Sequence, residues 1–376
     1  MKYDIAIVGG GMVGAALAVS LQNSELRIVL IDAATSHAND HRLIALNYAS
    51  VLFFKKLNLW ADLAPHAEAI NEVHVSNRGY FGTTRLTAKE MHIDHLGYVV
   101  PAKKINLALY EKLAELSHVK ILYGTKVTEL SQDPNEVEFT IQNQAEEKSL
   151  QASFLVAADG TFSTVRELLH IPTEMIDYQQ KALVTITELL RGHHHIAYER
   201  FLTNGAIAML PLTRQRAATI WSGDEKYIDE LLKLSDEDFL KKLQEHFGYR
   251  LGKFIKTQQR FSYPLKFIKA KQQVKNRVIL IGNAAHTVHP IAAQGLNVAL
   301  SEVNLLANHF NEKTQALFTE LPKIPMQKSV NLSHRLTQLF SADFFVINAA
   351  RQLGMIGLDI CLPVKKRFGK QTLGLL

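Results

Sequence analysis

The first 32 residues alternate between short apolar runs and breaks made of glycine or polar residues. A β-branched apolar run, Ile5 to Val8, stops at three glycines, and an uncharged Ala/Leu-rich stretch follows it as far as Leu21. After a polar break, a second apolar run from Arg27 to Ile31 ends at Asp32. Short β-branched runs favour buried strands, whereas the Ala/Leu-rich stretch favours a helix. The pattern predicts a strand, a tight turn, a helix and a second strand.

The glycines of this turn fit the G-x-G-x-x-G fingerprint of dinucleotide-binding folds. Gly9 permits the tight turn, Gly11 lets the backbone approach a pyrophosphate, and Gly14 lets the helix pack closely on the strand. The start of the helix then faces the anion with its free N–H groups. Asp32 follows Gly14 by 18 residues, a position from which a carboxylate binds ribose hydroxyls. The sequence therefore predicts a nucleotide-binding lobe.

Two other interpretations of this stretch are open. Residues 5–24 carry no charged side chain, as in a signal peptide or membrane anchor, but Asp4 stands where a basic leader would be, and the glycines would break a membrane helix. A dehydrogenase that binds only a nicotinamide dinucleotide also carries the fingerprint. Such a dehydrogenase does not explain the next two segments.

A second polar turn follows the strand predicted over 153–158. Asp159 and Gly160 end this strand, and Ser163 and Arg166 lie in a new helix. A carboxylate and a glycine at a strand end are typical of a turn. We expect this turn to lie beside a cofactor.

The third segment, residues 277–300, combines a strand, a polar turn, a loop and a helix. The strand ends at Gly282 and Asn283, the loop crosses to Pro290, and the helix starts near Gly295. A membrane helix is not expected, because the polar side chains of this segment would need partners in lipid. The free N–H groups at the helix start favour a group that gains negative charge, such as a reduced flavin. Taken alone, the segment also fits a buried strand, loop and helix with satisfied histidines.

A strand-rich region over roughly 178–263, with a helical insert near 224–247, separates the second segment from the third. The nucleotide-binding lobe must therefore be interrupted by a second, mostly-β lobe. A chain of 376 residues is also longer than one core usually supports. The expected division is a nucleotide lobe over 1–72, 98–175 and 268–330, a sheet lobe over 73–97 and 176–267, and a C-terminal helical region over 331–376.

Composition narrows the class of protein further. Apolar residues make up 47% and charged residues 21% of the chain, an ordinary globular balance. The single cysteine, Cys361, excludes an intrachain disulfide and favours a reducing compartment, the cytoplasm, where it would be a core thiol. The net charge of +6 is spread along the chain, so we expect no nucleic-acid partner.

Three consecutive histidines, His193 to His195, invite a metal-site interpretation. Neighbouring side chains of a strand point to opposite faces, and no acidic or cysteine residue has metal-ligand spacing from them. We therefore expect a solvated edge and no metal.

The three segments occur together and in order, and longer stretches accompany them. These stretches are H-R-L-I-A-L at 41–46, D-Y-Q-Q-K-A-L at 177–183, E-R-F-L-T-N-G-A-I-A-M-L-P-L at 199–212 and G-N-A-A-H-T-V-H-P-I at 282–291. The chain resembles the FAD-dependent aromatic hydroxylases of the para-hydroxybenzoate hydroxylase type, and more closely the ubiquinone-biosynthesis hydroxylases. The resemblance covers nearly the whole chain and implies an α/β fold, with a Rossmann-like FAD-binding lobe and an interleaved mostly-β substrate lobe.

By that resemblance, Asp32 holds the adenosine ribose, Arg42 the pyrophosphate and Asp159 the ribityl-phosphate region of FAD. The helix start from Gly295 to Asn297 faces the isoalloxazine. The residues expected to contact FAD are Gly9, Gly11, Met12, Val13, Gly14, Asp32, Arg42, Val127, Asp159, Gly160, Gly282, Asn283, Pro290, Gly295, Leu296 and Asn297.

The resemblance also implies a reaction. A monooxygenase would use FAD, O2 and NAD(P)H to hydroxylate a polyprenyl phenol, with the 2-polyprenyl-6-methoxyphenol step of ubiquinone biosynthesis as the expected reaction. A flavin hydroxylase of another phenol and a non-catalytic FAD-binding partner in a biosynthetic complex are the alternatives. No catalytic base is identifiable, although His286 and His289 are candidates for polar contacts near the ring. Asn283 and Glu302 stand where aspartate is common in the wider superfamily.

The C-terminal region is apolar but not suited to span a bilayer. Residues 336–364 are rich in Leu, Phe and Ile, and charged residues interrupt them, so this segment is a core-packed helix or an amphipathic surface. A basic group follows, made of Lys365, Lys366, Arg367 and Lys370. Because a polyprenyl tail must leave a bilayer or a partner protein, we expect peripheral contact of this end with the inner face of a membrane or with a ubiquinone-biosynthesis complex.

Overall fold

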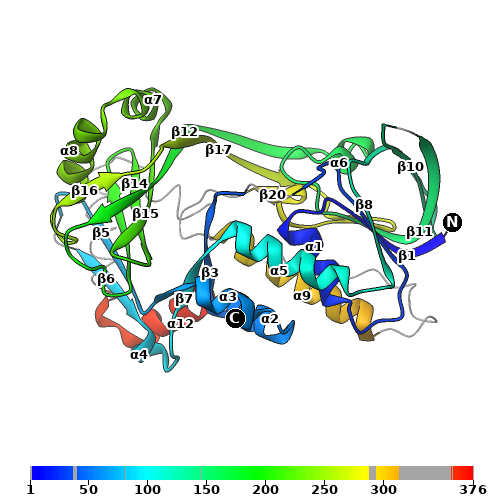
Figure 1. Ribbon diagram of the computed structural model, residues 1–376, viewed down its shortest axis with the longest axis horizontal. Coiled ribbons are helices and arrows are strands. Elements are labelled where there is room, and N and C mark those ends of the chain that lie inside the picture. The colour runs from blue at the N-terminus through cyan, green and yellow to red at the C-terminus, as the bar shows by residue number, and fades with distance from the viewer. Residues whose placement is uncertain are drawn as a thin grey trace.

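The computed structural model describes residues 2–36, 40–80, 82–144, 146–287, 294–312, 357 and 359–375. These residues form two lobes that long strands connect (Figure 1). One lobe is built on a largely parallel sheet covered by helices, and the other on a mostly antiparallel sheet. The predicted fold class, an α/β protein with a Rossmann-like lobe and an interleaved mostly-β lobe, is confirmed.

The first lobe contains a sheet of eight strands. Its central strands lie in the order β19-β11-β1-β2-β8, and all four neighbouring pairs are parallel. The buried residue Ile5 lies between Ile28 and Phe154 in this register, which explains why these strands read as apolar runs. The strands are β1 (Lys2–Val8), β2 (Ile28–Ile31), β8 (Val119–Leu122), β9 (Lys126–Gln132), β10 (Val137–Gln142), β11 (Glu147–Ala157), β18 (Val274–Lys275) and β19 (Val278–Leu280).

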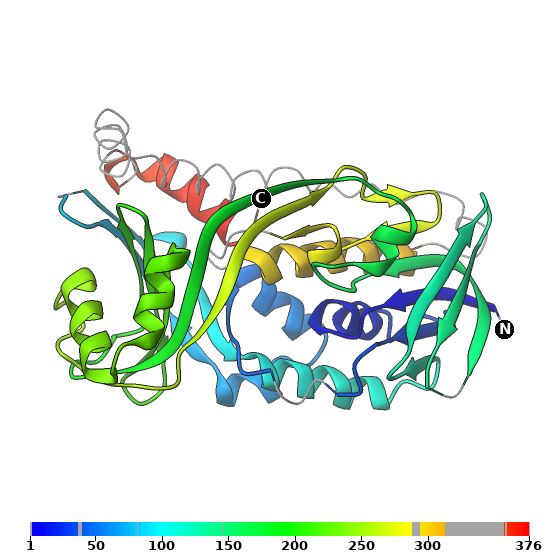
Figure 2. The ribbon, with the colours of Figure 1, turned by 90° about the horizontal axis from the view of Figure 1, so that it is seen from above.

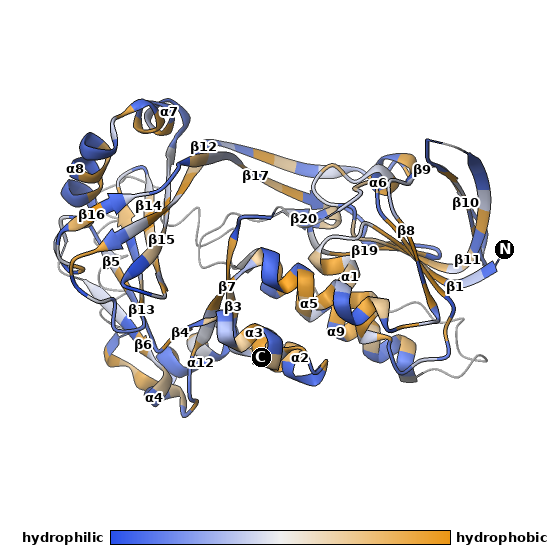
Figure 3. Cartoon of the chain, in the orientation of Figure 1, coloured by the Kyte–Doolittle hydropathy of each residue, from blue (hydrophilic) through white to orange (hydrophobic). Residues whose placement is uncertain are grey.

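Helices cover one face of this sheet. Helix α1 (Met12–Ser20) packs between α5 (Ala102–Ala114) and α9 (Gln294–Glu312), and its side chains from Ala15 to Val19 are fully buried. The absence of charge in this stretch is thus a property of a central helix, since a helix that is apolar all round must be covered on every side. The opposite face carries the β9–β10 hairpin and α6 (Thr164–Leu168). In Figure 3, α1, α5 and α9 lie together beside the sheet, and each carries apolar residues along its length.

The second lobe contains a sheet of nine strands, in the order β20-β17-β12-β15-β14-β13-β5-β6 with β16 paired to β12. Helices α7 (Glu225–Lys233) and α8 (Asp236–Phe247) cover one face, and Phe239, Leu243 and Phe247 of α8 are buried against it. The strands are β5 (Glu72–Asn77), β6 (Thr83–Thr87), β12 (Thr173–Leu189), β13 (Ile196–Leu202), β14 (Gly205–Leu212), β15 (Arg216–Asp224), β16 (Phe254–Thr257), β17 (Phe261–Ala270) and β20 (His286–Thr287).

A small antiparallel sheet, β3-β7-β4, lies between the lobes. Its strands β3 (Leu43–Asn47), β4 (Glu68–Ile70) and β7 (Gly97–Pro101) pack against the other face of the nine-stranded sheet. The short elements near it are α2 (Tyr48–Lys56), α3 (Trp60–Leu63), η1 (Ala64–His66) and α4 (Ala88–Met91).

The long strands β12 and β17 run from one lobe to the other (Figure 2). The expected division placed lobe boundaries at 175/176 and 267/268, and both positions fall inside these continuous strands. The exact division of the chain therefore stays a prediction.

The C-terminal helix α12 (Leu362–Thr372) packs against α4. Cys361, just before it, is exposed, so the expectation of a core thiol is wrong. Most of the apolar stretch predicted over 336–364 lies outside the described residues. Among the described helices, none is both long enough and apolar enough to cross a bilayer.

The three histidines lie in the turn between β12 and β13 rather than on a strand. His193 is only 8% exposed, so the expectation of a solvated edge is wrong for this residue. The turn bends sharply, because His194 and His195 both adopt positive φ angles, 51° and 59°.

Candidate cofactor site

The glycine-rich turn connects β1 to α1, and its glycines serve different purposes. Gly9 has a φ of +102°, and a Cβ atom on it would collide with the Ala158 carbonyl of the second turn. A Cβ atom on Gly14 would collide with the Gly9 carbonyl. Gly11, by contrast, has no atom of the described part of the chain within 4 Å of the place its Cβ would occupy. The space beside Gly11 is open, and the first-turn N–H groups of α1 border it, as an anion requires.

Asp32 directly follows β2, next to this turn, and is 6% exposed. Its Oδ1 accepts a hydrogen bond from the Ala34 N–H at 3.1 Å. Tyr110 of α5 reaches the same place, where its hydroxyl donates to the Gly10 carbonyl at 2.7 Å. Burial and the Asp32 charge both raise the pKa of Tyr110, so its hydroxyl stays protonated. Sequence reasoning missed Tyr110, which shares the ribose-binding corner with Asp32.

The second turn, after β11, lies directly against the first. The Asp159 carboxylate accepts from the Val165 N–H at 3.1 Å through Oδ2, whereas its buried Oδ1 has no hydrogen-bond partner among the described residues. Burial raises the pKa of this carboxyl, although hydrogen bonds from Ser163 and backbone N–H groups oppose the rise. Gly160 has a φ of +87° and open space beside it. A buried acceptor without a donor fits a ligand hydroxyl, such as one of the ribityl chain.

Hydrogen bonds tie the second turn to the third segment. Arg166 of α6 donates to the Ala284 carbonyl and to the Thr161 carbonyl, both at 2.8 Å. Asn283 Nδ2 lies 3.4 Å from the Thr161 hydroxyl. The three segments that are far apart in the sequence therefore form one continuous wall. The sequence pattern placed Arg166 in the second segment, but it did not indicate that the Arg166 side chain hydrogen-bonds to the third segment.

The third turn is anchored by a buried carboxylate of α9. Glu302 is 2% exposed and accepts from the Gly282 N–H at 2.6 Å. Its other oxygen lies 2.6 Å from His286 Nε2, and His286 is 3% exposed. Because a buried charge is costly without partners, this pair fixes the turn at Gly282 and Asn283 against α9.

The start of α9 is held by Asn297. Its Oδ1 accepts from the Asn47 N–H at 2.9 Å and from the Ser50 hydroxyl at 2.7 Å, and its Nδ2 donates to the Ala45 carbonyl at 2.9 Å. The side chain of Asn297 is thus committed to β3 and α2, which leaves backbone groups near Gly295 for contact with an isoalloxazine.

The remaining predicted residues vary in their placement. Arg42 is 57% exposed, and its guanidinium is paired with Asp40 at 2.6 Å, so it must leave Asp40 to reach a phosphate. Val127 is buried in the core under β9 and β10 and offers only its backbone. Met12 and Val13 form the first turn of α1, Leu296 packs against the main core, and Pro290 and His289 lie outside the described residues.

These observations fit FAD. The open space at Gly11 with the α1 N-terminus suits a pyrophosphate, Asp32 suits ribose hydroxyls, and the unpartnered Oδ1 of Asp159 suits a hydroxyl donor. The start of α9 provides the N–H groups of a helix terminus at the far end of this wall. Which predicted residues contact the cofactor stays a prediction.

Comparisons with known proteins point to the same cofactor. A family model described as FAD binding domain matches residues 2–315. Ubiquinone hydroxylase UbiL of Rhodospirillum rubrum is 30% identical over 99% of this chain and 90% of its own length. Ubiquinone hydroxylase UbiM of Neisseria meningitidis is 32% identical over 84% of this chain and 70% of its own length.

Among solved structures, p-nitrophenol 4-monooxygenase PnpA of Pseudomonas putida superimposes with a TM-score of 0.80. It is 18% identical, and the match covers 99% of this chain and 98% of that one. At this identity the likeness concerns the fold.

Proposed function

Because the chain belongs to the FAD-dependent ubiquinone-biosynthesis hydroxylases, we propose that it hydroxylates the ring of a polyprenyl phenol, at the 2-polyprenyl-6-methoxyphenol step. It is an FAD-dependent monooxygenase by family, and aromatic substrates and O2 belong to that chemistry. The observation that carries the proposal is the wall made by the three turns, with open space at Gly11. FAD, once bound, supplies the activation of O2, with NAD(P)H as the proposed electron donor.

The chain's own contribution is to position the ring and to keep water out. A small apolar cluster lies where β12 and β17 pass the first turn of α9, and it consists of Phe267, Val298, Ile176 and Tyr178. Burial raises the pKa of Tyr178 to about 12, so its hydroxyl remains neutral at physiological pH. An apolar wall one turn from the predicted isoalloxazine contact at Gly295 suits an aromatic ring with a hydrocarbon tail.

The test uses purified, FAD-loaded protein with NADPH or NADH, O2 and a short-tailed 2-polyprenyl-6-methoxyphenol. We expect substrate-dependent NAD(P)H oxidation and a product that carries one oxygen atom from isotope-labelled O2, detected by mass spectrometry. A nitrophenol supplied in parallel distinguishes a hydroxylase of another phenol. Retained FAD with no oxidation and no product for either phenol, even with an added flavin reductase, would favour the non-catalytic partner instead.

The C-terminal end of the chain is the part that we propose contacts the source of a lipid-like substrate. Lys365 is 5% exposed and is neutralised by Glu90 and Asp359, each at 3.0 Å, so it does not belong to a docking surface. Arg367 and Lys370 of α12 are exposed, and Ile360 just before the helix is 77% exposed. This basic and apolar edge supports peripheral attachment to an anionic membrane or to a biosynthetic complex.

A further inference from the structure

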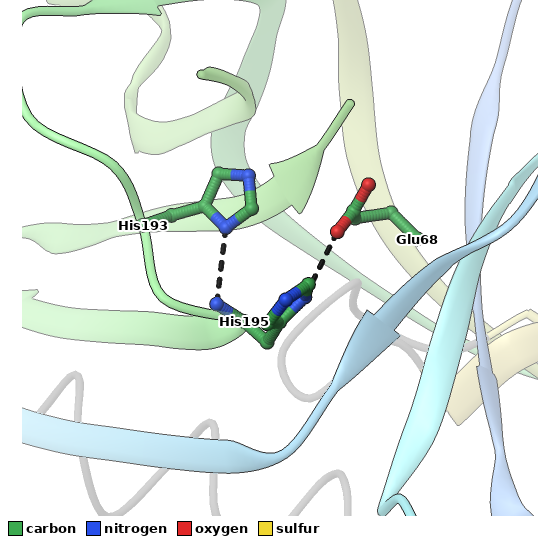
Figure 4. Close-up of side chains that lie close together, drawn as sticks. All are labelled: Glu68, His193 and His195. Atoms are coloured by element: carbon green, nitrogen blue, oxygen red, sulfur yellow. Dashed lines mark hydrogen bonds and ion pairs between the residues drawn. The ribbon is translucent and has the colours of Figure 1, made fainter. Parts of the chain in front are cut away.

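The fold brings an acidic side chain to the three histidines. Glu68 of β4 lies 2.9 Å from His195 Nδ1 through its Oε1 (Figure 4). Glu68, His193 and His195 each offer one possible metal-ligand atom, and these three atoms all lie within 4.8 Å of one another. The first sequence-based argument against a metal assumed a strand, but the histidines lie in a turn. The second argument was the lack of a nearby acidic residue, but Glu68 comes from a strand that is distant in the sequence.

The ring of His193 is already oriented as a metal ligand. Its Nε2 lies 2.7 Å from the Leu212 carbonyl, which can only accept, so Nε2 carries the hydrogen and Nδ1 carries the acceptor lone pair. That lone pair accepts the His195 backbone N–H at 3.1 Å, a hydrogen bond that a bound metal ion would displace. Metal-bound histidines commonly have this arrangement, in which the second ring nitrogen donates to a backbone carbonyl.

The backbone of the turn that carries His195 is strained. His194 and His195 both lie in the left-handed region, which costs a non-glycine residue on the order of 1 kcal/mol each. The His195 carbonyl is fixed as well, because it accepts from the Asn71 N–H at 2.8 Å. Such strain persists only where the surroundings determine it, and it is often found at ligand-binding positions.

We propose that Glu68, His193 and His195 bind a divalent transition metal, with Zn²⁺ as the preferred ion. Two imidazole nitrogens and one carboxylate oxygen form a common zinc set, and water would fill the fourth position. Tetrahedral zinc needs ligand atoms about 3.3 Å apart, so no distance within the group has to change by more than about 1.5 Å. The side chain of His195 is 48% exposed, so it has room to turn towards a bound ion.

The ion would act structurally. Glu68 belongs to the three-stranded sheet between the lobes, whereas the histidines belong to the turn between β12 and β13 of the nine-stranded sheet. One metal ion would therefore join two sheets. This inference is independent of the proposed hydroxylase activity, because none of the three residues belongs to the three cofactor segments.

The test is Zn²⁺ titration of the chelator-treated, full-length protein by calorimetry, with Co²⁺ absorption spectra as a second measurement. We expect one tight site with tetrahedral Co²⁺ bands and a higher Tm with Zn²⁺. His195→Asn and Glu68→Gln should each weaken binding at least tenfold, about 1.4 kcal/mol. The matched control is His194→Asn, which removes the neighbouring imidazole at a similar φ angle, since asparagine tolerates the left-handed region. Its affinity should stay within about twofold of the wild-type value.

No saturable binding to the wild-type protein would overturn the site. Equal affinity in all variants, or an equal loss in the His194 control, would also overturn it. If a variant fails to fold, the wild-type Co²⁺ spectrum decides, because octahedral bands without imidazole ligation contradict the proposed ligands.

Discussion

At the scale of single residues, two glycines of the first turn are required for packing, whereas the third leaves space for a ligand. Gly9 and Gly14 are needed because a side chain on either would strike the backbone of a neighbouring segment. Gly11 has an ordinary φ of −63°, and no described atom lies near its Cβ position, so the described residues place no requirement for glycine there. The fingerprint predicted all three positions, and the structure assigns the free space to Gly11 alone.

Gly11→Leu should therefore remove FAD binding and leave the fold intact. The leucine side chain would fill the space that a pyrophosphate needs, and we expect FAD affinity to fall at least roughly 100-fold, on the order of 3 kcal/mol. Flavin absorbance after gel filtration measures retention, and circular dichroism with Tm checks the fold. Gly14→Ala is the contrasting variant, because it should lower Tm through its collision with Gly9. Full flavin retention by Gly11→Leu would refute the assigned pyrophosphate position.

His74 provides a prediction about pH. It is 2% exposed on β5, and its Nε2 accepts from Arg250 at 2.7 Å. Burial, followed by the charge of Arg250, lowers the pKa of His74 from 6.5 to about 4. Between these two values the unfolded state binds more protons, so stability must fall as the pH drops from 6.5 towards 4.

The full loss for His74 is about 3 kcal/mol, reached only below pH 4. His74→Gln cannot titrate, so its unfolding free energy should change less between pH 6.5 and pH 4.5 than that of the wild-type protein. Urea unfolding across this range measures both slopes. Equal slopes for the two proteins would show that His74 is not neutral in the folded state.

The role of a residue could be predicted from the sequence where the conformation of the local backbone allows only certain amino acids. Asp32 and the glycines follow from the geometry of a strand–turn–helix. The arrival of Tyr110 of α5 beside Asp32 depends on how separate elements pack. No local pattern reports such a contact.

At the scale of elements, one carboxylate connects α9 to the third turn. Glu302→Ala would leave the Gly282 N–H and His286 buried without their partner, so we expect a loss of about 3 kcal/mol in unfolding free energy. FAD affinity should also fall, because η2 (Gly282–Ala284) would no longer be fixed. Denaturant unfolding and a flavin titration measure the two effects.

Glu302→Gln is the control for this prediction. An amide oxygen can still accept from Gly282, and the amide nitrogen can donate to the other tautomer of His286, so the loss should be about 1 kcal/mol. If the alanine and glutamine variants lose equal stability, the hydrogen bonds to Glu302 do not hold the turn.

Element prediction succeeded where the period of apolar residues was clear and failed where tertiary pairing decided the outcome. The glycine turn, α1 and the helical insert now seen as α7 and α8 follow from pattern and caps, such as the Asp224 and Ser235 side chains that accept from helix N–H groups. The histidine turn could not be foreseen, since Glu68 arrives through strand pairing of β4 with β7.

At the scale of the whole molecule, the C-terminal helix is part of the folded body. Asn47 of β3 donates to the Thr372 carbonyl, and the Ala49 N–H donates to the Leu373 carbonyl, both at 3.1 Å. Leu373 is 4% exposed within the core beneath β7 and β14. Deleting residues 336–376 would uncover this core, so a truncated protein could lose membrane binding only because it is misfolded.

Charge reversal tests the membrane proposal without this defect. Arg367 and Lys370 are exposed on α12, and each basic residue near an anionic leaflet contributes roughly 1 kcal/mol, so Arg367→Glu with Lys370→Glu should weaken vesicle binding at least about 30-fold. The control reverses Lys233 and Lys241, which are exposed on α7 and α8 and lie apart from α12 in Figure 1. Co-sedimentation with vesicles of mixed anionic and neutral lipids measures the binding, and Tm with flavin content confirms that both variants fold.

Equal sedimentation of the two variants would show that net charge, not the α12 edge, attracts the protein to the membrane. If the wild-type protein does not sediment with vesicles, the membrane proposal is wrong, and a protein complex is then the proposed source of the substrate.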